Sequence, residues 1–427
     1  MPTGDKEKRK VLIVAAKLGY QTRIFAEAAV RLGWEPVMAT DRCSRLDDPW
    51  GDHAIPVKFA EPEAAVARLQ DKIGEIAGIV AVGDRPTPVA ALAAQRFGLR
   101  FHPPAAVEAA RNKYLARERW RAAGLAVPDY SRVRLEDGVE LAVQQAHFPC
   151  VLKPLGLSGS RGVIRANDRD EFAAAFRRIE RILELPDVKL MRDESSRFLQ
   201  VEEYIPGREY ALEGLMTDGV LRTLALFDKP EPLEGPFFEE TIYVTPSRAP
   251  EEDQARMRAA IQRAATALGL SDGPVHAELR FNERGAWVLE VAARPIGGLC
   301  ARALQFNGGV PLEEIILRHA AGEPIGPLEP DGPASGVMMI PIPRDGIYQD
   351  VRGVDAALRV AGIEAVEITA KSGQAMLRLP EGSSYLGFLF ARGERPEKVE
   401  AALREAHAAL SFVFSEMLPV LGKSPAL

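Results

Sequence analysis

Apolar and polar positions follow two different patterns along this chain. Near the N-terminus, VLIVAAKLGYQTRIFAEAAVRLGWEPVMAT (residues 11–40) gives an apolar run, a loop, an amphipathic helix and a second apolar run. The apolar run GIVAVGD (78–84) and the helical stretch ALAAQRFGL (91–99) come next. This succession predicts a doubly wound, parallel-sheet α/β domain, which we place at residues 1–106.

A long helical stretch, AAVEAARNKYLARERWRAAG (105–124), separates this part from a region of short strands. There, CVLKP (150–154), FLQVEEYI (198–205), EYALEGLM (209–216) and WVLEV (287–291) alternate with helices at 169–183 and 252–269. The pattern predicts an α+β domain with a largely antiparallel sheet. We place it at 107–331, with a small lobe at about 125–205 and a catalytic lobe at about 206–331.

The remaining residues carry three further apolar strands and one helical pattern. The strands are SGVMMIPIP (335–343), EAVEITAK (364–371) and YLGFLFARG (385–393), and the helix is PEKVEAALREAHAALSFV (396–413). We expect residues 332–427 to form a separate lobe or a lid.

Composition narrows the classes of partner. The chain has 427 residues, 47% of them hydrophobic, and a net charge of −6, which argues against nucleic acid as the main partner. No apolar run reaches the roughly 18 residues that a membrane span needs, and the first ten residues lack the apolar core of a secretory signal. We therefore expect a cytoplasmic protein with small-molecule partners. Cys43, Cys150 and Cys300 lie far apart, without zinc-site spacing, so any metal should be a hard, oxygen-bound cation.

A lysine followed by small residues is the first candidate for chemistry. The strand FPCVLKP presents Lys153 and runs into a loop with Ser158, Gly159, Ser160 and Gly162. Such a loop can turn successive N–H groups toward phosphate oxygens, and the lysine adds a positive charge. The lysine precedes the glycines, which excludes a Walker-type P-loop. An ordinary hairpin with a surface lysine is the alternative interpretation of this motif alone.

A second wall for the same site follows in QVEEYIPGREY. The backbone from Glu202 through Glu203 and Tyr204 to Ile205 could bind the edge of an adenine, and Glu209 could accept hydrogen bonds from ribose hydroxyls.

Two glutamates on neighbouring strands form the third element. Glu278 in HAELRF and Glu290 in WVLEVAARPIGG lie at matching phase, and two facing carboxylates repel unless a cation lies between them. Magnesium favours such oxygen ligands. Arg294 lies four residues beyond Glu290 and could bind a carboxylate or a developing phosphoryl charge. His276 points to the face of Glu278 and is either a phosphate or substrate contact or a buried structural histidine.

Substrate contacts are expected from three further places. Glu240, in the proline-rich stretch DKPEPLEGPFFEETIYVTP (228–246), could receive a substrate ammonium, or it is a solvated loop residue. Gly297 and Gly298 leave room for a substrate side chain or serve helix packing. The loops at Lys17 to Thr22 and Gly83 to Pro86 follow parallel strands, where ligands bind in such sheets. Asp84 there either positions a substrate or caps a turn.

The chain carries five stretches in a fixed order: RNKYLARE, VLKPLGLSGSRGV, VEEYIPGREY, HAELRF and LEVAARPIGG. With this ordered set it resembles the ATP-grasp superfamily, and more closely the dipeptide-forming L-amino acid ligases within it. The resemblance implies that Lys113 and Lys153 hold ATP phosphates and that the loop 158–162 closes over them. It also implies an adenine hinge at 202–205, a ribose contact at Glu209, magnesium ligands at Glu278 and Glu290, and stabilisation of the acyl phosphate by Arg294.

The resemblance further implies one or two Mg²⁺ ions, with Mn²⁺ as an alternative, and a homodimer. One position departs from the pattern of many members, because Ala292 stands where they carry asparagine. The implied reaction activates a carboxylate as an acyl phosphate and joins it to an amine. The competing interpretations are an ATP-grasp carboxylase that activates bicarbonate and an ATP-binding module without catalysis. A dinucleotide-dependent oxidoreductase is excluded, because the first strand lacks a glycine fingerprint.

Overall fold

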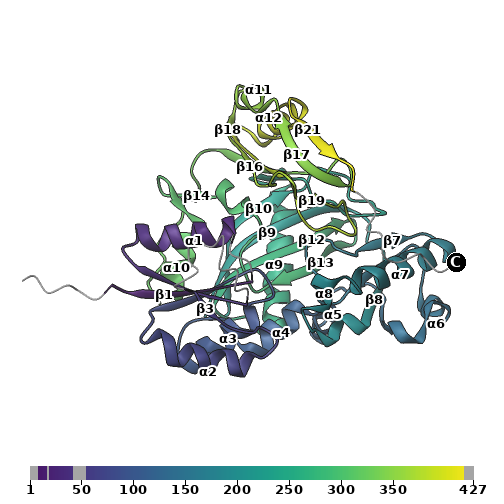
Figure 1. The fold of residues 1–427 in the computed structure, drawn as a ribbon, viewed down its shortest axis with the longest axis horizontal. Helices are drawn as coiled ribbons and strands as arrows, with labels where there is room; N and C mark the ends of the chain where they lie inside the picture. The colour runs from purple at the N-terminus through teal and green to yellow at the C-terminus, as the bar shows by residue number, and fades with distance from the viewer. Residues whose placement is uncertain (1–7, 17–18, 42–53, 418–427) are drawn as a thin grey trace, which may run out of the picture.

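The N-terminal sheet is parallel and covered by helices on both faces. The computed structural model describes residues 8–16, 19–41 and 54–417. Strands β1 (Lys10–Ala15), β2 (Glu35–Thr40), β3 (Ile55–Pro56) and β4 (Gly78–Val82) pair in the order β3-β2-β1-β4. Leu12 and Val14 of β1 pack with α2 (Pro62–Ile73) and α3 (Thr87–Phe97), whereas Val11 and Ile13 pack with α1 (Tyr20–Arg31) (Figure 1). The predicted doubly wound fold is confirmed.

The helical stretch after this domain is divided in two, where the sequence predicted one helix. Helix α4 (Pro104–Arg111) ends at Asn112, which has an extended backbone, and α5 (Lys113–Ala122) begins directly after it. The Asn112 side chain accepts hydrogen bonds from the backbone N–H groups of Tyr114 and Leu115, which caps α5. Lys113 therefore occupies the first position of a helix.

A four-stranded antiparallel sheet follows, in the order β5-β8-β6-β7. Its strands are β5 (Tyr130–Arg134), β6 (Cys150–Pro154), β7 (Ile164–Ala166) and β8 (Phe198–Glu203). The amphipathic helix α7 (Arg169–Leu183) packs its apolar face on this sheet, and Asp168 caps its N-terminus. Short helices α6 (Val139–Ala142) and α8 (Pro186–Lys189) complete the lobe.

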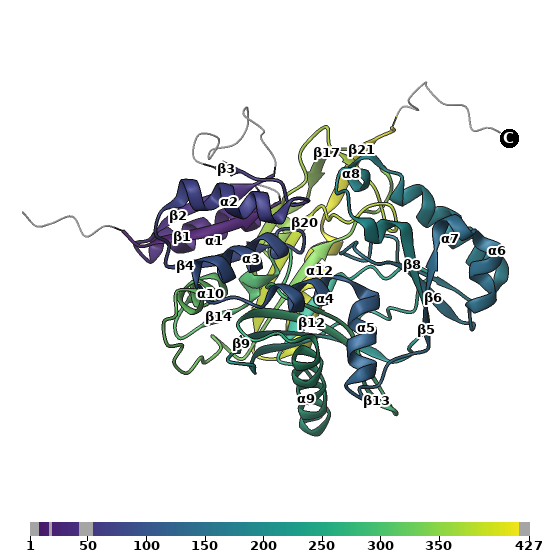
Figure 2. The same cartoon turned by 90° about the horizontal axis from the view of Figure 1, so that it is seen from below.

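The central sheet has eight strands in the order β13-β12-β9-β10-β11-β16-β20-β18. They are β9 (Arg208–Thr217), β10 (Val220–Asp228), β11 (Ile242–Thr245), β12 (Gly273–Asn282), β13 (Gly285–Ala292), β16 (Ala334–Ile340), β18 (Ile363–Ile368) and β20 (Gly387–Gly393). Helices α9 (Glu251–Leu268) and α10 (Leu312–Ala320) pack against it, and β14 (Gln305–Phe306) pairs with β15 (Val310–Pro311) nearby. The N-terminal sheet and the four-stranded sheet lie on opposite sides of the central strands (Figure 2).

The C-terminal region shares the central sheet with the region that precedes it. Strands β16, β20 and β18 continue the central sheet, with β16 paired to β11. The last predicted helix is also shorter, since α12 (Pro396–Ala408) ends before residues 411–413. Those residues belong to β21 (Ser411–Ser415), which pairs with β17 (Gly346–Arg352) beside β19 (Ala375–Met376) and α11 (Val354–Leu358). The domain boundaries themselves stay predictions.

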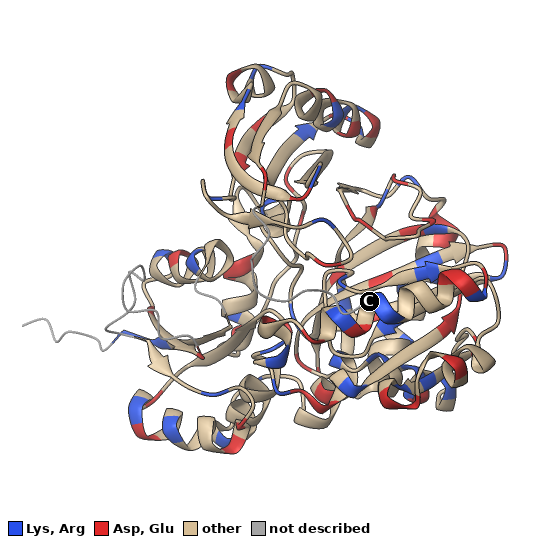
Figure 3. Ribbon diagram, turned by 45° about the vertical axis from the view of Figure 1, so that its right-hand side comes forward, with Lys and Arg blue, Asp and Glu red and all other residues tan. Residues whose placement is uncertain are grey.

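Acidic and basic residues are interspersed along the elements visible in Figure 3. Within the described part of the chain, none of the helices has the length and apolar character needed to cross a bilayer.

Candidate active site

A cavity of about 890 Å³ opens where the N-terminal domain, the four-stranded sheet, the central sheet and the C-terminal region meet. It is lined by every residue that the sequence predicted for the site, with the exception of Gly162. Gly162 instead lies under the loop, where an added Cβ would come within 2.7 Å of the Pro154 ring. Lys17 and Cys43 lie outside the described residues.

The phosphate side of the cavity holds two lysines and the small-residue loop. The Lys113 ammonium donates to the Leu157 carbonyl over 2.6 Å and lies 3.8 Å from the Glu290 carboxylate. Gly159 and Ser160 have φ of 64° and 53°, the left-handed geometry that aims consecutive N–H groups toward one side. Lys153 is ion-paired with Glu202, and burial lowers its pKa despite that partner.

The Glu202 side chain has a role that sequence reasoning missed. It is only 3% exposed and accepts hydrogen bonds from Arg117 and Gln200 as well as from Lys153. Burial alone would raise the pKa of Glu202, but the charges of Arg117 and Lys153 outweigh it and lower the pKa to about 2. Glu202 is thus an ionised anchor that fixes the position of Lys153.

In the predicted adenine hinge, fewer backbone N–H groups are free to bind an adenine than the sequence suggested. The N–H groups of Glu203 and Tyr204 already donate to the carbonyls of Asp129 and Pro149, at 2.9 and 3.0 Å. Glu202 pairs with a strand on each side. Ile205 lies beyond the end of β8, so its N–H is the hinge donor best placed for an adenine edge.

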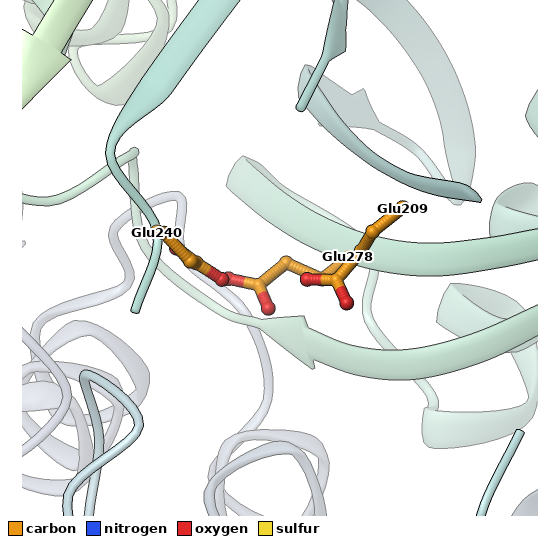
Figure 4. A group of neighbouring side chains, drawn as sticks. All are labelled: Glu209, Glu240 and Glu278. Carbon is orange, nitrogen blue, oxygen red and sulfur yellow. The ribbon is translucent and has the colours of Figure 1, made fainter. Parts of the chain in front are cut away.

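Lys229 is a second residue that we did not predict, and it lies behind the wall of the cavity. It directly follows β10, and its ammonium lies 2.6 Å from Glu240, 2.9 Å from Glu209 and 3.4 Å from Glu278. Figure 4 shows Glu240 and Glu278 directed toward one another with Glu209 alongside. Burial lowers the pKa of Lys229, but the three carboxylates outweigh it and raise the pKa well above its usual value. The sequence did contain a signal for Lys229, because it lies between an apolar strand and the loop that carries the candidate Glu240.

Glu209 and Glu240 are both held by protein cations. Glu209 also accepts from Arg280 over 3.0 Å, which leaves its carboxylate less free for a ribose than we expected. Glu240 accepts from Lys229 and from the Tyr243 hydroxyl, each over 2.6 Å. Burial and the charge of Glu278 raise the pKa of Glu240 to about 7, against the lowering effect of Lys229.

The two predicted metal ligands are direct cross-strand partners. Glu278 of β12 pairs with Glu290 of β13, next to a bulge at Glu278 and Leu279. Single carboxylate oxygens of Glu209, Glu240 and Glu278 lie within 4.8 Å of one another. The Lys229 ammonium already lies beside all three of these carboxylates, whereas Glu278 and Glu290 on their paired strands offer hard oxygen donors of the kind that Mg²⁺ prefers. Ala292 lies opposite His276 and is buried, so its position supplies no ligand atom to a second ion.

His276 is buried between two carboxylates. Its ring nitrogens lie 3.2 Å from Glu213 and 3.5 Å from Glu278. Burial lowers its pKa, but hydrogen bonds to both glutamates outweigh this and raise it to about 9. The histidine therefore holds Glu278 in place while it lines the cavity.

Arg294 and Asp84 contact one another, although 210 positions separate them. The glycines after Arg294 differ from each other. An added Cβ at Gly297 would meet nothing within 4 Å, which fits the predicted room for a substrate. At Gly298, where φ is +64°, the Cβ would lie 2.9 Å from the Phe388 ring. Gly298 therefore serves packing instead.

Two regions of the chain match known protein families. The ATP-grasp domain family matches residues 146–303, and L-amino acid ligase C-terminal domain 2 matches residues 338–415. An uncharacterized protein, y4rH of Sinorhizobium fredii, is 25% identical over 97% of this chain and 85% of its own length.

Two similar proteins have informative names. The alanine–anticapsin ligase of Bacillus subtilis is 29% identical over 60% of this chain, and the match spans 57% of that ligase. The crystal structure of an L-amino acid ligase from Bacillus licheniformis superposes with a TM-score of 0.78 at 24% identity, over 96% of this chain and all of that one. The chain thus carries an ATP-grasp domain at residues 146–303, followed at residues 338–415 by a C-terminal domain of the L-amino acid ligase type.

Proposed function

We propose that this protein is an ATP-dependent carboxylate–amine ligase that activates an amino acid or a related carboxylate as an acyl phosphate and joins it to an amine. One observation carries the proposal: Lys113, Lys153, Glu278, Glu290 and Arg294 come from four separate segments and line one cavity. The matched ATP-grasp domain and the named ligase relatives support the same activity.

The first half-reaction is phosphoryl transfer. A substrate carboxylate oxygen attacks the γ-phosphorus of ATP, the bond to the β,γ-bridging oxygen breaks, and ADP leaves. Lys113, Lys153 and the N–H groups of residues 158–161 bind the phosphates, and the Ile205 N–H binds the adenine. Glu278 and Glu290 would hold Mg²⁺, which when bound neutralises phosphate charge.

The second half-reaction is acyl transfer. The amine attacks the acyl carbon, a C–N bond forms, the bond from the acyl carbon to the phosphate oxygen breaks, and the departing inorganic phosphate takes up the proton that the amine loses. Arg294 faces the same cavity and stabilises the negative charge that develops on oxygen. Water must be excluded during this step, because it would hydrolyse an acyl phosphate.

ADP release measured over single amino acids and amino acid pairs tests this function, with mass spectrometry of the products. We expect ADP release that depends on a pair, together with an amide product. The matched controls are Glu290→Gln and Lys153→Met, which should both abolish the signal. ADP release with bicarbonate alone would instead indicate a carboxylase. ATP binding without turnover across the panel would indicate a binding module.

Glu240 is the proposed partner of the substrate ammonium. We expect Glu240→Gln to raise the Michaelis constant for the first amino acid about tenfold, since a charge-assisted hydrogen bond is lost. Glu239→Gln is the control, because Glu239 is adjacent and does not line the cavity. An unchanged Michaelis constant in the Glu240 variant would contradict the assignment.

A homodimer and a cytoplasmic location stay predictions.

A further inference from the structure

Arg294 is held by a residue of another domain. Asp84 follows β4 of the N-terminal sheet, whereas Arg294 lies two residues after β13 of the central sheet. The guanidinium Nε and Nη2 donate to the two carboxylate oxygens of Asp84 over 2.9 and 3.1 Å. This paired geometry fixes the plane and direction of a guanidinium as a single hydrogen bond cannot.

The hydrogen-bonding capacity of Arg294 is only partly used by the protein. An arginine side chain has five N–H groups. Two of those on Arg294 point to Asp84, and one on Nη1 donates to the Pro295 carbonyl over 3.0 Å. One N–H on each terminal nitrogen thus has no protein acceptor among the described hydrogen bonds, and the side chain lines the cavity.

Asp84 is itself rigidly placed. Its carbonyl accepts hydrogen bonds from the hydroxyl and the N–H of Thr87 over 2.6 and 3.2 Å, at the start of α3. Burial disfavours the Asp84 carboxylate, yet Arg294, Lys113 and Arg111 outweigh it and lower its pKa. An ionised, immobile carboxylate is suited to aim a neighbouring cation.

We propose that Asp84 is a positioning residue: it does not contact substrate but orients Arg294, so that the two remaining N–H groups meet the oxygens that become negative during acyl transfer. The inference rests on the proposed ligase function. It gives the N-terminal domain a direct part in the reaction. It differs from both interpretations that the sequence left open for Asp84, a substrate contact and a turn cap.

The test compares Asp84→Asn with a matched control. Asp272→Asn is suitable, because Asp272 also joins the central sheet to an arginine of the N-terminal domain, Arg100, at 3.6 Å and outside the cavity. We expect Asp84→Asn to lower kcat for ADP release about 10- to 100-fold with little change in the Michaelis constant for ATP, because a small misplacement at a reacting centre has such effects. Asp272→Asn should retain kcat at a similar Tm.

A double variant separates positioning from direct substrate binding. Lysine cannot form the paired contact, so adding Asp84→Asn to Arg294→Lys should lower kcat no further. A further fall in kcat as large as the one that Asp84→Asn causes alone would overturn the inference. An Asp84→Asn enzyme with unchanged or higher kcat would also overturn it. A higher kcat would mean that Asp84 competes with substrate for Arg294.

A binding measurement distinguishes this inference from the proposed function. In isothermal titration of MgADP-loaded protein with inorganic phosphate, Asp84→Asn should weaken phosphate binding about tenfold, whereas Asp272→Asn should not. If wild-type protein gives no amide product but shows this difference, the ligase proposal fails and the positioning role of Asp84 stands. Equal phosphate affinity in all three proteins would refute the positioning role.

Discussion

Glu313 is a buried carboxyl group whose protonation links the stability of the protein to pH. It lies in the first turn of α10 and is 3% exposed, and the ion pairs of the described residues do not include it. Burial raises its pKa to about 7, above the ordinary value of 4.5. Between these two pH values the folded protein therefore binds more protons than the unfolded chain. This group's contribution to the free energy of unfolding falls as pH rises through that window.

We predict that Glu313→Gln is more stable than the wild type at pH 8, by about 1–3 kcal/mol, and nearly equal to it at pH 5. Urea unfolding at both pH values measures the difference. Glu314→Gln is the control, since Glu314 is adjacent and pairs with Arg31 at 2.7 Å. That change should alter stability by at most about 1 kcal/mol at either pH. If Glu313→Gln differed from the wild type by the same free energy of unfolding at pH 5 and pH 8, titration of Glu313 would be ruled out as the cause.

Single residues also show where sequence reasoning ended. The strand-borne pair Glu278 and Glu290 could be predicted, because the phase of two strands is local information. Gly297 and Gly298 could not be told apart, since their difference depends on Phe388, about ninety positions away. Lys229 could have been proposed from its place after a strand, but its three carboxylate partners come from separate segments.

At the level of elements, the junction of α4 and α5 positions a lysine of the site. An asparagine inside an amphipathic pattern does not reveal whether the helix continues, because the residue tolerates a helix interior and also favours caps. The end of α12 was missed for a different reason. Residues 411–415 become a strand by pairing with β17, about sixty positions earlier.

We predict that Asn112→Ala lowers the free energy of unfolding by about 1 kcal/mol, the usual cost of a lost cap. It should also raise the Michaelis constant for ATP several-fold, because Lys113 is then held less firmly. Urea unfolding and ATP-dependent kinetics measure the two effects. Asn112→Asp retains an acceptor and should show neither effect. A variant that loses stability but keeps its Michaelis constant would separate the cap from nucleotide binding.

On the scale of the whole molecule, the C-terminal region contacts the loop 158–162, which we propose binds the phosphates. The Gly162 N–H donates to the Pro380 carbonyl over 3.0 Å, and Arg161 donates to the Glu381 carbonyl over 2.8 Å. The Arg178 guanidinium of α7 forms two hydrogen bonds, of 2.6 and 2.8 Å, with the Glu381 carboxylate. These contacts could not be predicted, because the sequence suggested a lid without indicating what it would touch.

We predict that Glu381→Gln raises the Michaelis constant for ATP about three- to tenfold and speeds nucleotide release, since Arg178 then no longer fixes residue 381, whose carbonyl accepts from Arg161 of the loop. Stability should change by at most about 1 kcal/mol, because about a third of each side chain is exposed. Stopped-flow release of a fluorescent nucleotide measures the effect. Glu136→Gln, which removes an exposed partner of Arg134 and Arg197, is the control. Equal release rates would show that the contact does not restrain the loop.

The continuity of the central sheet restricts how this protein can be re-engineered. Strands β11 and β16 pair residue by residue, from Ile242 with Met338 to Thr245 with Ser335. A chimaera that takes everything after residue 331 from a relative would join two halves of one hydrogen-bonded ladder from different parents. Exchange of specificity should therefore proceed through point changes around Gly297, or through transplanting β11 and β16 as a unit.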